Sequence, residues 1–447
     1  MKIIYCLNQF LPHRRAGTEV YVWALSKEMQ RLGHTVTVLI PYPGSPVSEE
    51  YEYDGIRVIR YAEPTVADRE FLRSRRAPDG LPVFLTFVRE IGPSVVHMHE
   101  FNWSNGITLH HFEALKAMGI PVVLTFHLAG YTCRTGRLMY MGKEMCDGII
   151  RPARCAKCSL DDSLPNKAMA RLLYLASLPF YGLGIHTAKW NSRLGTSLSF
   201  PYLIEDLKSS LERLTGVTDR IIVLTRWYKK MLLENGVPEG KLTYIRQGLP
   251  YGELQHRRTA RRNGGTIRLA FLGRIDPFKG LHLLLQALSG LTPGRISLDI
   301  YGQVVDESYY QRCLELTGPN GGVEWKGIIS PEEVIPLLTT YDALCLPSTF
   351  SEMSPLVIEE AFAAGIPVIG SNVYGIAERV RHGQNGLLFA FNDAGSLQQN
   401  LQRLIDEQGL LEQLTAKVAE PAVFSEIASA TNDVYENLVK KHLSKIE

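Results

Sequence analysis

This sequence lacks several features that would place a protein among nucleic-acid-binding, secreted, membrane-spanning or dinucleotide-binding proteins. Its 48 lysines and arginines nearly balance 46 aspartates and glutamates, so a net charge of +2 provides no field for binding nucleic acid. The first residues form a short apolar run with one lysine, which predicts a first β-strand and a cytoplasmic chain rather than a signal peptide. The longest apolar run, residues 172–185, is too short to span a bilayer. No G-x-G-x-x-G follows the first strand, which argues against a dehydrogenase.

What the sequence does contain is one architectural pattern used twice. Short β-branched runs alternate with helical segments, first in KIIYCL, HTVTVLI, SVVHMH, PVVLTFH and RIIVLT, and then in TIRLAFLG, ISLDIYG, ALCLPS and PVIGS. This rhythm predicts an α/β protein of two Rossmann-like, doubly wound domains, residues 1–251 and 266–421, joined by a polar linker at 252–265. Because ligands of such sheets bind beyond the carboxyl ends of the strands, a central cleft between two facing domains is expected.

One strand-to-helix stretch, SEMSPLVIEEAFAAGIPVIGS, carries two acids in apolar surroundings. Ser354 is expected to cap a helix with Pro355 at its first position, and Gly365 to end it. Glu352 then precedes the helix and Glu360 lies in its second turn. A helix N-terminus suits a diphosphate, and carboxylates suit sugar hydroxyls, so the stretch predicts a pocket for a nucleotide diphosphate sugar. A glutamate-rich surface helix is the alternative.

This stretch resembles the E-x7-E signature of the retaining glycosyltransferases of family 4, which have the GT-B fold of two facing Rossmann-like domains. The resemblance implies that Glu360 binds the ribose of the donor nucleotide and that Glu352 holds the donor sugar. Met-Ser-Pro stands where the family more often has Pro-Phe-Gly, which leaves the identity of the sugar open. The backbone amides implied to face sugar and phosphate are those of Met353, Ser354, Leu356 and Val357.

The stretch LAFLGRIDPFKG supplies cations to the same domain. Gly273 is expected at a strand end, with Arg274 and Lys279 in the loop that opens the next helix. Two cations there could neutralise a leaving diphosphate without a metal, although two solvated loop cations are the alternative. The stretch resembles the G-R-x4-K-G element of the family, in which both cations contact the diphosphate.

The first domain contributes fewer candidates. Gly17 lies at a loop-to-helix junction where a backbone can approach a phosphate, and the resemblance assigns it to the donor phosphate, although Ala16 replaces a usual second glycine. His127 ends a predicted strand and matches the family position that touches the donor sugar; a packed core histidine is the alternative. His99 and Glu100 end a neighbouring strand and are candidates for binding the acceptor.

Four cysteines lie in a predicted insertion of about residues 131–160 in the first domain. Cys133, Cys146, Cys155 and Cys158 have the spacing C-x12-C-x8-C-x2-C, and a closing C-x2-C is typical of a zinc knuckle. A structural zinc ion would hold together an insertion with little apolar content, whereas four reduced thiols are the alternative. No cofactor is expected for catalysis.

The segment 161–265 is basic, with sixteen lysines and arginines against nine aspartates and glutamates, interleaved with aliphatic and aromatic residues. This composition fits peripheral contact with an anionic membrane. Helices packed on the first domain are the favoured interpretation, because the apolar residues show no one-sided stripe over the whole segment.

Together these features predict a retaining, metal-independent glycosyltransferase that moves a sugar from a nucleotide diphosphate donor of UDP, GDP or ADP type. The acceptor would be a carbohydrate or a lipid-linked molecule, in the synthesis of a bacterial surface glycan at the inner face of the membrane. The resemblance implies front-face substitution and a final helix, about 422–447, that packs back on the first domain. A nucleotide-sugar epimerase or hydrolase and a non-catalytic partner subunit are the alternatives. The residues expected in catalysis are His127, Arg274, Lys279 and Glu352.

Overall fold

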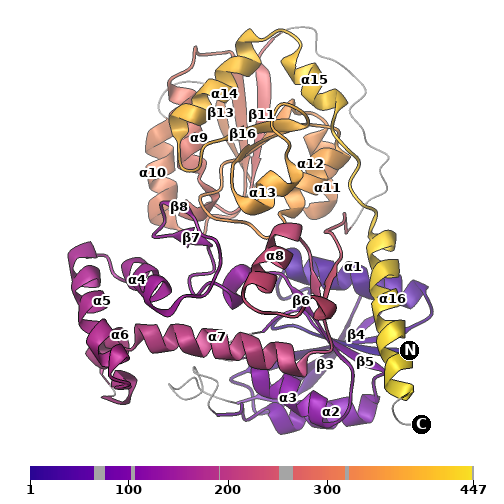
Figure 1. Ribbon diagram of the computed structural model, residues 1–447. Helices are drawn as coiled ribbons and strands as arrows, with labels where there is room; N and C mark the ends of the chain where they lie inside the picture. Colours follow the sequence, from indigo (N-terminus) through magenta and orange to yellow (C-terminus); the bar gives the residue numbers. More distant parts are fainter. Residues whose placement is uncertain (65–75, 102–105, 191, 251–264, 318–321, 445–447) are drawn as a thin grey trace. The chain divides into compact units, whose positions relative to one another are not determined.

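The chain forms two units, each built on its own mainly parallel sheet (Figure 1). The computed structural model describes residues 1–64, 76–101, 106–190, 192–250, 265–317 and 322–444, so the predicted linker at 252–265 lies almost wholly outside the described residues. Unit 1 comprises Met1–Gly136, Asp147–Pro250 and Val423–Glu447, and unit 2 comprises Arg137–Cys146 and Tyr251–Ala422.

The sheet of unit 1 has eight strands in the order β10-β9-β6-β5-β1-β2-β4-β3. Every neighbouring pair is parallel except β3 with β4, which form an antiparallel edge. The central strands are almost entirely buried, as expected for a parallel sheet covered on both faces. The strands are β1 (Lys2–Cys6), β2 (Thr35–Pro43), β3 (Glu49–Tyr53), β4 (Ile56–Glu63), β5 (Val95–Met98), β6 (Val122–Phe126), β9 (Arg220–Val223) and β10 (Leu242–Tyr244).

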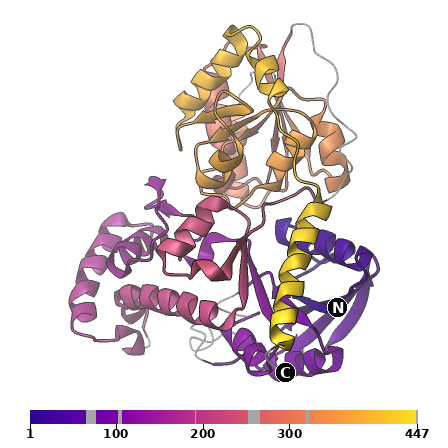
Figure 2. The ribbon, with the colours of Figure 1, turned by 45° about the vertical axis from the view of Figure 1, so that its right-hand side comes forward.

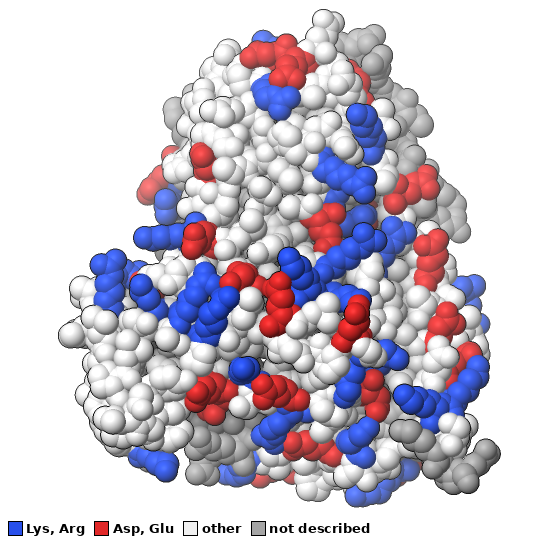
Figure 3. Space-filling model, viewed as in Figure 1, with Lys and Arg blue, Asp and Glu red and all other residues white. Residues whose placement is uncertain are grey.

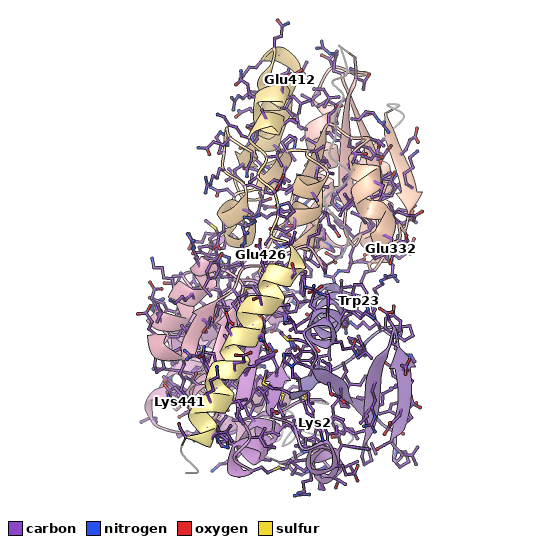
Figure 4. The ribbon with its side chains drawn as sticks, turned by 90° about the vertical axis from the view of Figure 1, so that its right-hand side faces the viewer. Lys2, Trp23, Glu332, Glu412, Glu426 and Lys441 are labelled. Carbon is purple, nitrogen blue, oxygen red and sulfur yellow. The ribbon has the colours of Figure 1, made fainter. Side chains whose placement is uncertain are left out.

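The last helix of the chain, α16, belongs to unit 1 and packs along α1 (Figure 2). Its buried face includes Ile427 and Tyr435, and Glu426 near its start pairs with Arg246 at 3.6 Å. Figure 4 shows the helix from Glu426 to Lys441. The helices of unit 1 are α1 (Gly17–Arg31), α2 (Leu81–Ile91), α3 (Leu109–Ala117), α4 (Pro152–Ser163), α5 (Lys167–Gly182), α6 (Arg193–Leu198), α7 (Phe200–Val217), α8 (Arg226–Glu234) and α16 (Phe424–Leu443), with short 3-10 turns η2 (Ala129–Tyr131), η3 (Thr187–Trp190) and η4 (Glu239–Lys241).

Unit 2 contains a six-stranded, wholly parallel sheet in the order β13-β12-β11-β14-β15-β16. One apolar cluster packs α9, α10 and α14 on the sheet. The strands are β11 (Ile267–Leu272), β12 (Ile296–Tyr301), β13 (Val323–Gly327), β14 (Ala343–Leu346), β15 (Val368–Ser371) and β16 (Gly386–Phe389). The helices are η5 (Pro277–Lys279), α9 (Leu281–Ser289), α10 (Glu307–Thr317), α11 (Pro331–Leu338), α12 (Leu356–Ala363), α13 (Tyr374–Arg379), α14 (Ala394–Asp406) and α15 (Leu410–Ala416).

A small hairpin of β7 (Met139–Tyr140) and β8 (Glu144–Met145) also belongs to unit 2. The sequence assigns the whole insertion of about 131–160 to the first domain, and for Arg137–Cys146 this assignment is wrong. The physical reason is a backbone contact inside unit 2, because the amide of Ser351 donates to the carbonyl of Arg137 at 3.0 Å.

The nine strand-like runs quoted above all form strands, so the prediction of two Rossmann-like α/β units is confirmed. The edge strands β3, β10, β13 and β16 were not among them, since edge strands carry weaker apolar patterns than central ones. In the described part of the chain, no helix has the length and the apolar character needed to cross a bilayer.

Candidate functional site

The loop after β11 begins the candidate donor site of unit 2. Gly273 follows the strand directly, and Arg274 comes next, with its guanidinium 3.1 Å from Asp276. The other carboxylate oxygen of Asp276 accepts hydrogen bonds from the amides of Phe278 and Lys279, at 2.9 and 3.1 Å. One buried aspartate therefore caps the short turn η5 and holds the Arg274 side chain beside it.

The centre of this site is an ion pair between Lys279 and Glu352. The Lys279 ammonium lies 2.7 Å from Oε1 of Glu352, and the side chains are only 17% and 9% exposed. The hydroxyl of Ser348 donates to the same carboxylate oxygen at 2.6 Å. The structure thus brings together the two residues that the sequence assigns to the diphosphate and to the donor sugar, from loops that follow neighbouring strands β11 and β14.

Backbone contacts fix these two loops against each other. The amide of Thr349 donates to the carbonyl of Phe278 at 2.8 Å, and the Thr349 hydroxyl donates to that of Pro277 at 2.9 Å. Gly280 has a left-handed φ of +68°, and a Cβ added there would lie 1.9 Å from the carbonyl oxygen of Pro347. Only glycine permits this approach, which keeps Lys279 within reach of the loop after β14.

The helix after this loop starts one residue later than expected. Pro355 is the N-cap of α12, with an extended ψ of 117°, and Ser354 makes no side-chain cap. The prediction that Ser354 caps a helix with Pro355 at its first position is therefore wrong, because the backbone turns helical only at Leu356. Gly365, with φ of +76°, follows the helix end as predicted. Leu356 and Val357 form the first turn, and Met353 is buried in the loop.

The two adjacent glutamates of α12 have different surroundings. Glu359 is 1% exposed and forms a bidentate pair with Arg379 of α13, at 2.5 and 2.7 Å. Glu360 is 6% exposed, in the second turn of the helix. Sequence reasoning singles out Glu360 and misses the buried pair of Glu359, because its partner lies twenty residues further along the chain.

Two further contacts around Glu352 could not be read from the sequence. Gly375 lies at the start of α13, where a Cβ would come within 2.0 Å of the Glu352 carbonyl oxygen. The guanidinium of Arg137, from the hairpin segment, lies 4.5 Å from the centre of the Phe278 ring. Both support the site from distant parts of the sequence, so local patterns give no signal for them.

Unit 1 gathers three histidines near the carboxyl ends of β5 and β6: His97 lies within β5, and His99 and His127 directly follow the two strands. His99 Nδ1 and His127 Nε2 are 3.1 Å apart, and His97 stacks on His99 with ring centroids 3.9 Å apart. His97 also lies 2.7 Å from the Thr125 hydroxyl and 2.5 Å from the hydroxyl of Tyr435 of α16. Burial lowers the pKa of His127 to about 3 and the pKa values of His97 and His99 well below 6.5. All three are therefore neutral near pH 7.

The pairing of these neutral rings constrains their tautomers. Nε2 of His99 is buried and has no hydrogen-bond partner among the described residues. A buried acceptor without a partner is less unfavourable than a buried N–H donor without one, so the proton of His99 belongs on Nδ1, which donates to His127. His127 then carries its own proton on Nδ1. The side chain predicted to contact the sugar, His127, is thus neutral, and its Nδ1–H is a hydrogen-bond donor.

Glu100 lies near a second acid that the sequence analysis misses. The amide of Asn8 donates to Glu100 at 2.7 Å, and burial raises the pKa of Glu100, with a smaller contribution from Glu19. Glu19 is 2% exposed and pairs with Arg14 at 3.2 Å, while its Oε2 has no partner among the described residues. In the sequence, Glu19 looks like an ordinary acid in a first helical turn. One buried and one half-buried carboxylate suit an acceptor rich in hydroxyls.

Gly17 and the cysteines complete the predicted set. Gly17 is the first residue of α1, as expected for a loop-to-helix junction. Cys133, Cys146, Cys155 and Cys158 are all thiols, and burial raises the pKa of Cys155. Within the described residues, no three His, Cys, Asp or Glu side chains are arranged to hold a metal ion. The structural zinc ion expected on the four cysteines stays a prediction.

Comparison with known proteins finds one glycosyltransferase family model in each half of the chain. Residues 253–420 match the family described as glycosyl transferases group 1, and residues 16–154 match the glycosyl transferase 4-like domain. An exopolysaccharide phosphotransferase of Streptomyces coelicolor is 31% identical over 206 residues, which cover 45% of this chain and 21% of that protein. A glycogen synthase of Mycobacterium tuberculosis is 30% identical over 210 residues, covering 44% and 48%.

The chain thus spans less than half the length of either relative. Among solved structures, Anabaena HepE in complex with UDP and glucose has a TM-score of 0.59 and 13% identity, over 100% of this chain and 99% of that one. At this level of identity the likeness concerns the fold alone. With a parallel sheet in each unit, the chain has the GT-B fold of glycosyltransferases, and each unit carries a glycosyltransferase domain: a 4-like domain within residues 16–154 and a group 1 domain within residues 253–420.

Proposed function

We propose that this protein is a retaining, metal-independent glycosyltransferase that uses a nucleotide diphosphate sugar. The acceptor is a carbohydrate or a lipid-linked molecule in the synthesis of a bacterial surface glycan, at the inner face of the cytoplasmic membrane. The family match supports the transferase class. The names of the two relatives, an exopolysaccharide enzyme and a glycogen synthase, support a glycan product.

The buried pair of Lys279 and Glu352 carries this proposal. If Lys279 and Glu352 are separated, each becomes an uncompensated charge largely away from water. Lys279 then needs an anionic partner, and Glu352 needs a partner with hydroxyl groups. A sugar diphosphate provides both groups in one molecule. Its phosphates would take Lys279 and Arg274, and its sugar hydroxyls would donate to Glu352.

The remaining roles follow the family resemblance. Glu360 is assigned to the ribose, and the amides at the start of α12 are assigned to the sugar and phosphate, since a helix N-terminus favours anions. The leaving phosphate would accept the proton of the acceptor hydroxyl while the two cations stabilise its charge. In unit 1, Gly17 and His127 are assigned to the donor, and His99 and Glu100 to the acceptor.

Two other activities fit a nucleotide-sugar site. An epimerase or hydrolase would use the same donor contacts, and a non-catalytic partner subunit would keep the fold alone. The intact Arg274, Lys279, Glu352 and Glu360 argue against the partner subunit. A hydrolase would release free sugar without an acceptor, which separates it from a transferase by product alone.

The test starts with calorimetric titration of UDP, GDP and ADP into the purified chain. One nucleotide should bind selectively, and Lys279→Ala should weaken it about 10- to 150-fold, since a charge-assisted contact contributes about 1.5–3 kcal/mol. Lys417→Ala, an exposed lysine of unit 2, is the matched control. Mass spectrometry with the matching donor and candidate acceptors then identifies a new glycosidic product. Absence of binding by all three nucleotides would sink the proposal.

Stereochemistry and metal content are tested on the same material. Retention predicts that the product has the anomeric configuration of the donor, which proton NMR measures; an inverted product contradicts it. Activity should persist in a chelator. The structural zinc ion predicted for the four cysteines is tested by elemental analysis of untagged protein, and protein without zinc contradicts it.

A further inference from the structure

The helix α5 exposes its apolar side instead of burying it. Within the helix, only Ala170 and Ser177 are buried. Leu172 lies on the opposite side, with Met169 and Leu175 about 60° to either side of it at the 100° spacing of a helix. These three side chains are 61%, 47% and 61% exposed. An ordinary surface helix shows the reverse pattern, so this face is built to contact something apolar.

The exposed apolar side chains continue beyond α5 into η3 and α6. Leu183 is 75% exposed, and Trp190, which packs edge-on against Phe180, is 49% exposed. α5 packs against α4, α6 and α7, and Figure 3 shows this part of the molecule as largely white with blue side chains at its margin. We call this region the α5–α6 surface; it consists of Met169, Leu172, Leu175, Leu183, Ile185, Trp190 and Leu194.

The charged residues of the segment that carries the α5–α6 surface have one sign. Residues 167–204 contain four cations and no aspartate or glutamate. Lys167 pairs with Asp161 at 3.2 Å, whereas no ion-pair partner is found in the described part of the chain for the other three cations. A second copy of the chain would bring these like charges together, so the charge disfavours a homodimer and favours an anionic partner. Those three cations are Arg171, Lys189 and Arg193.

We propose that the α5–α6 surface docks on an anionic lipid bilayer, with its leucines in the acyl boundary and its cations on the lipid phosphates. Apolar and basic residues together are the composition of a helix that lies in a membrane interface. No described helix is able to span a bilayer, so the contact is peripheral. The inference rests on the proposed function insofar as a lipid-linked acceptor would be presented at the same membrane.

Flotation of the full chain with lipid vesicles tests this proposal. Vesicles of phosphatidylcholine mixed with phosphatidylglycerol should bind the protein at about 0.1 M salt and release it at about 1 M, where the Debye length falls from about 10 Å to about 3 Å. Pure phosphatidylcholine should bind it weakly. Leu172→Glu with Leu175→Glu should lower the partition coefficient about tenfold for each leucine, and each cation replaced by Gln about fivefold. Val47→Glu, at a residue 65% exposed elsewhere in unit 1, should leave binding unchanged.

The outcomes separate the alternatives. Binding to anionic vesicles that is lost in the leucine variant and kept in Val47→Glu supports the proposal. It is overturned if the unmodified chain ignores anionic vesicles, if the leucine variant still floats, or if ultracentrifugation shows a dimer that the leucine variant abolishes. Nucleotide binding is measured on the same preparations, and circular dichroism confirms folding. Failure of nucleotide binding with intact flotation contradicts the donor site and leaves the docking surface standing.

Discussion

Removing one member of the Lys279–Glu352 pair should affect stability and ligand binding by separable amounts. The perturbation is Lys279→Met, which keeps most of the length of the side chain and leaves Glu352 with the hydrogen bond from the Ser348 hydroxyl. Breaking a buried pair costs about 3–5 kcal/mol, and because Lys279 is 17% exposed we expect a smaller cost, about 2–3 kcal/mol. For a unit of this size that corresponds to a fall in melting temperature of about 5–10 °C.

The double variant Lys279→Met with Glu352→Gln distinguishes the two effects. With both charges gone, no buried charge is left uncompensated, so calorimetry should show that most of the lost melting temperature returns, with a coupling energy of about 1–2 kcal/mol. Nucleoside diphosphate affinity should stay about 10- to 150-fold reduced, because the phosphate contact is still missing. Additive losses of stability, or unchanged nucleotide affinity in the single variant, would refute the reasoning.

Three further predictions concern single residues. Glu359→Gln should destabilise the protein by about 3–5 kcal/mol, because it breaks the buried pair with Arg379, and Glu360→Gln should weaken nucleotide binding about tenfold; calorimetry measures both. Gly375→Ala should displace the loop after β14 and lower nucleotide affinity at least about tenfold, with Gly216→Ala in α7, where nothing lies within 4 Å of an added Cβ, as control. Burial lowers the pKa of His111 to about 3, so below about pH 6.5 the unfolded chain binds a proton that the folded chain does not. As the pH falls from about 6.5 to about 3, this residue should lower the free energy of unfolding by about 1.4 kcal/mol for each pH unit. Urea titrations should show that His111→Gln lacks that part of the slope, and an unchanged slope contradicts the assignment.

The sequence predicts the local parts of the donor site well. Gly273, Arg274 and Lys279 all follow β11 within a few residues, and strand, loop and helix are encoded by neighbouring positions. The E-x7-E spacing likewise places Glu352 before a helix and Glu360 within it.

What the sequence could not predict depends on contacts between distant positions. Arg379 pairs with Glu359 from another helix, and Tyr435 reaches His97 across 338 residues. The apolar face of α5 emerges only when its helical bounds are known, because over the whole of 161–265 the pattern is averaged across several helices.

The chain crosses between its two units four times, after Gly136, Cys146, Pro250 and Ala422. A fragment that begins after Pro250 would therefore omit the hairpin segment 137–146, in which the carbonyl of Arg137 accepts a hydrogen bond from the amide of Ser351. Such a fragment would lack a backbone contact of the loop that carries Glu352. To fold as it does in the full chain, an isolated unit 2 would need residues 137–146, added as a separate peptide or joined through a new turn. Success of that experiment would show that ten residues from the first half of the sequence complete a site whose other residues lie in the second half.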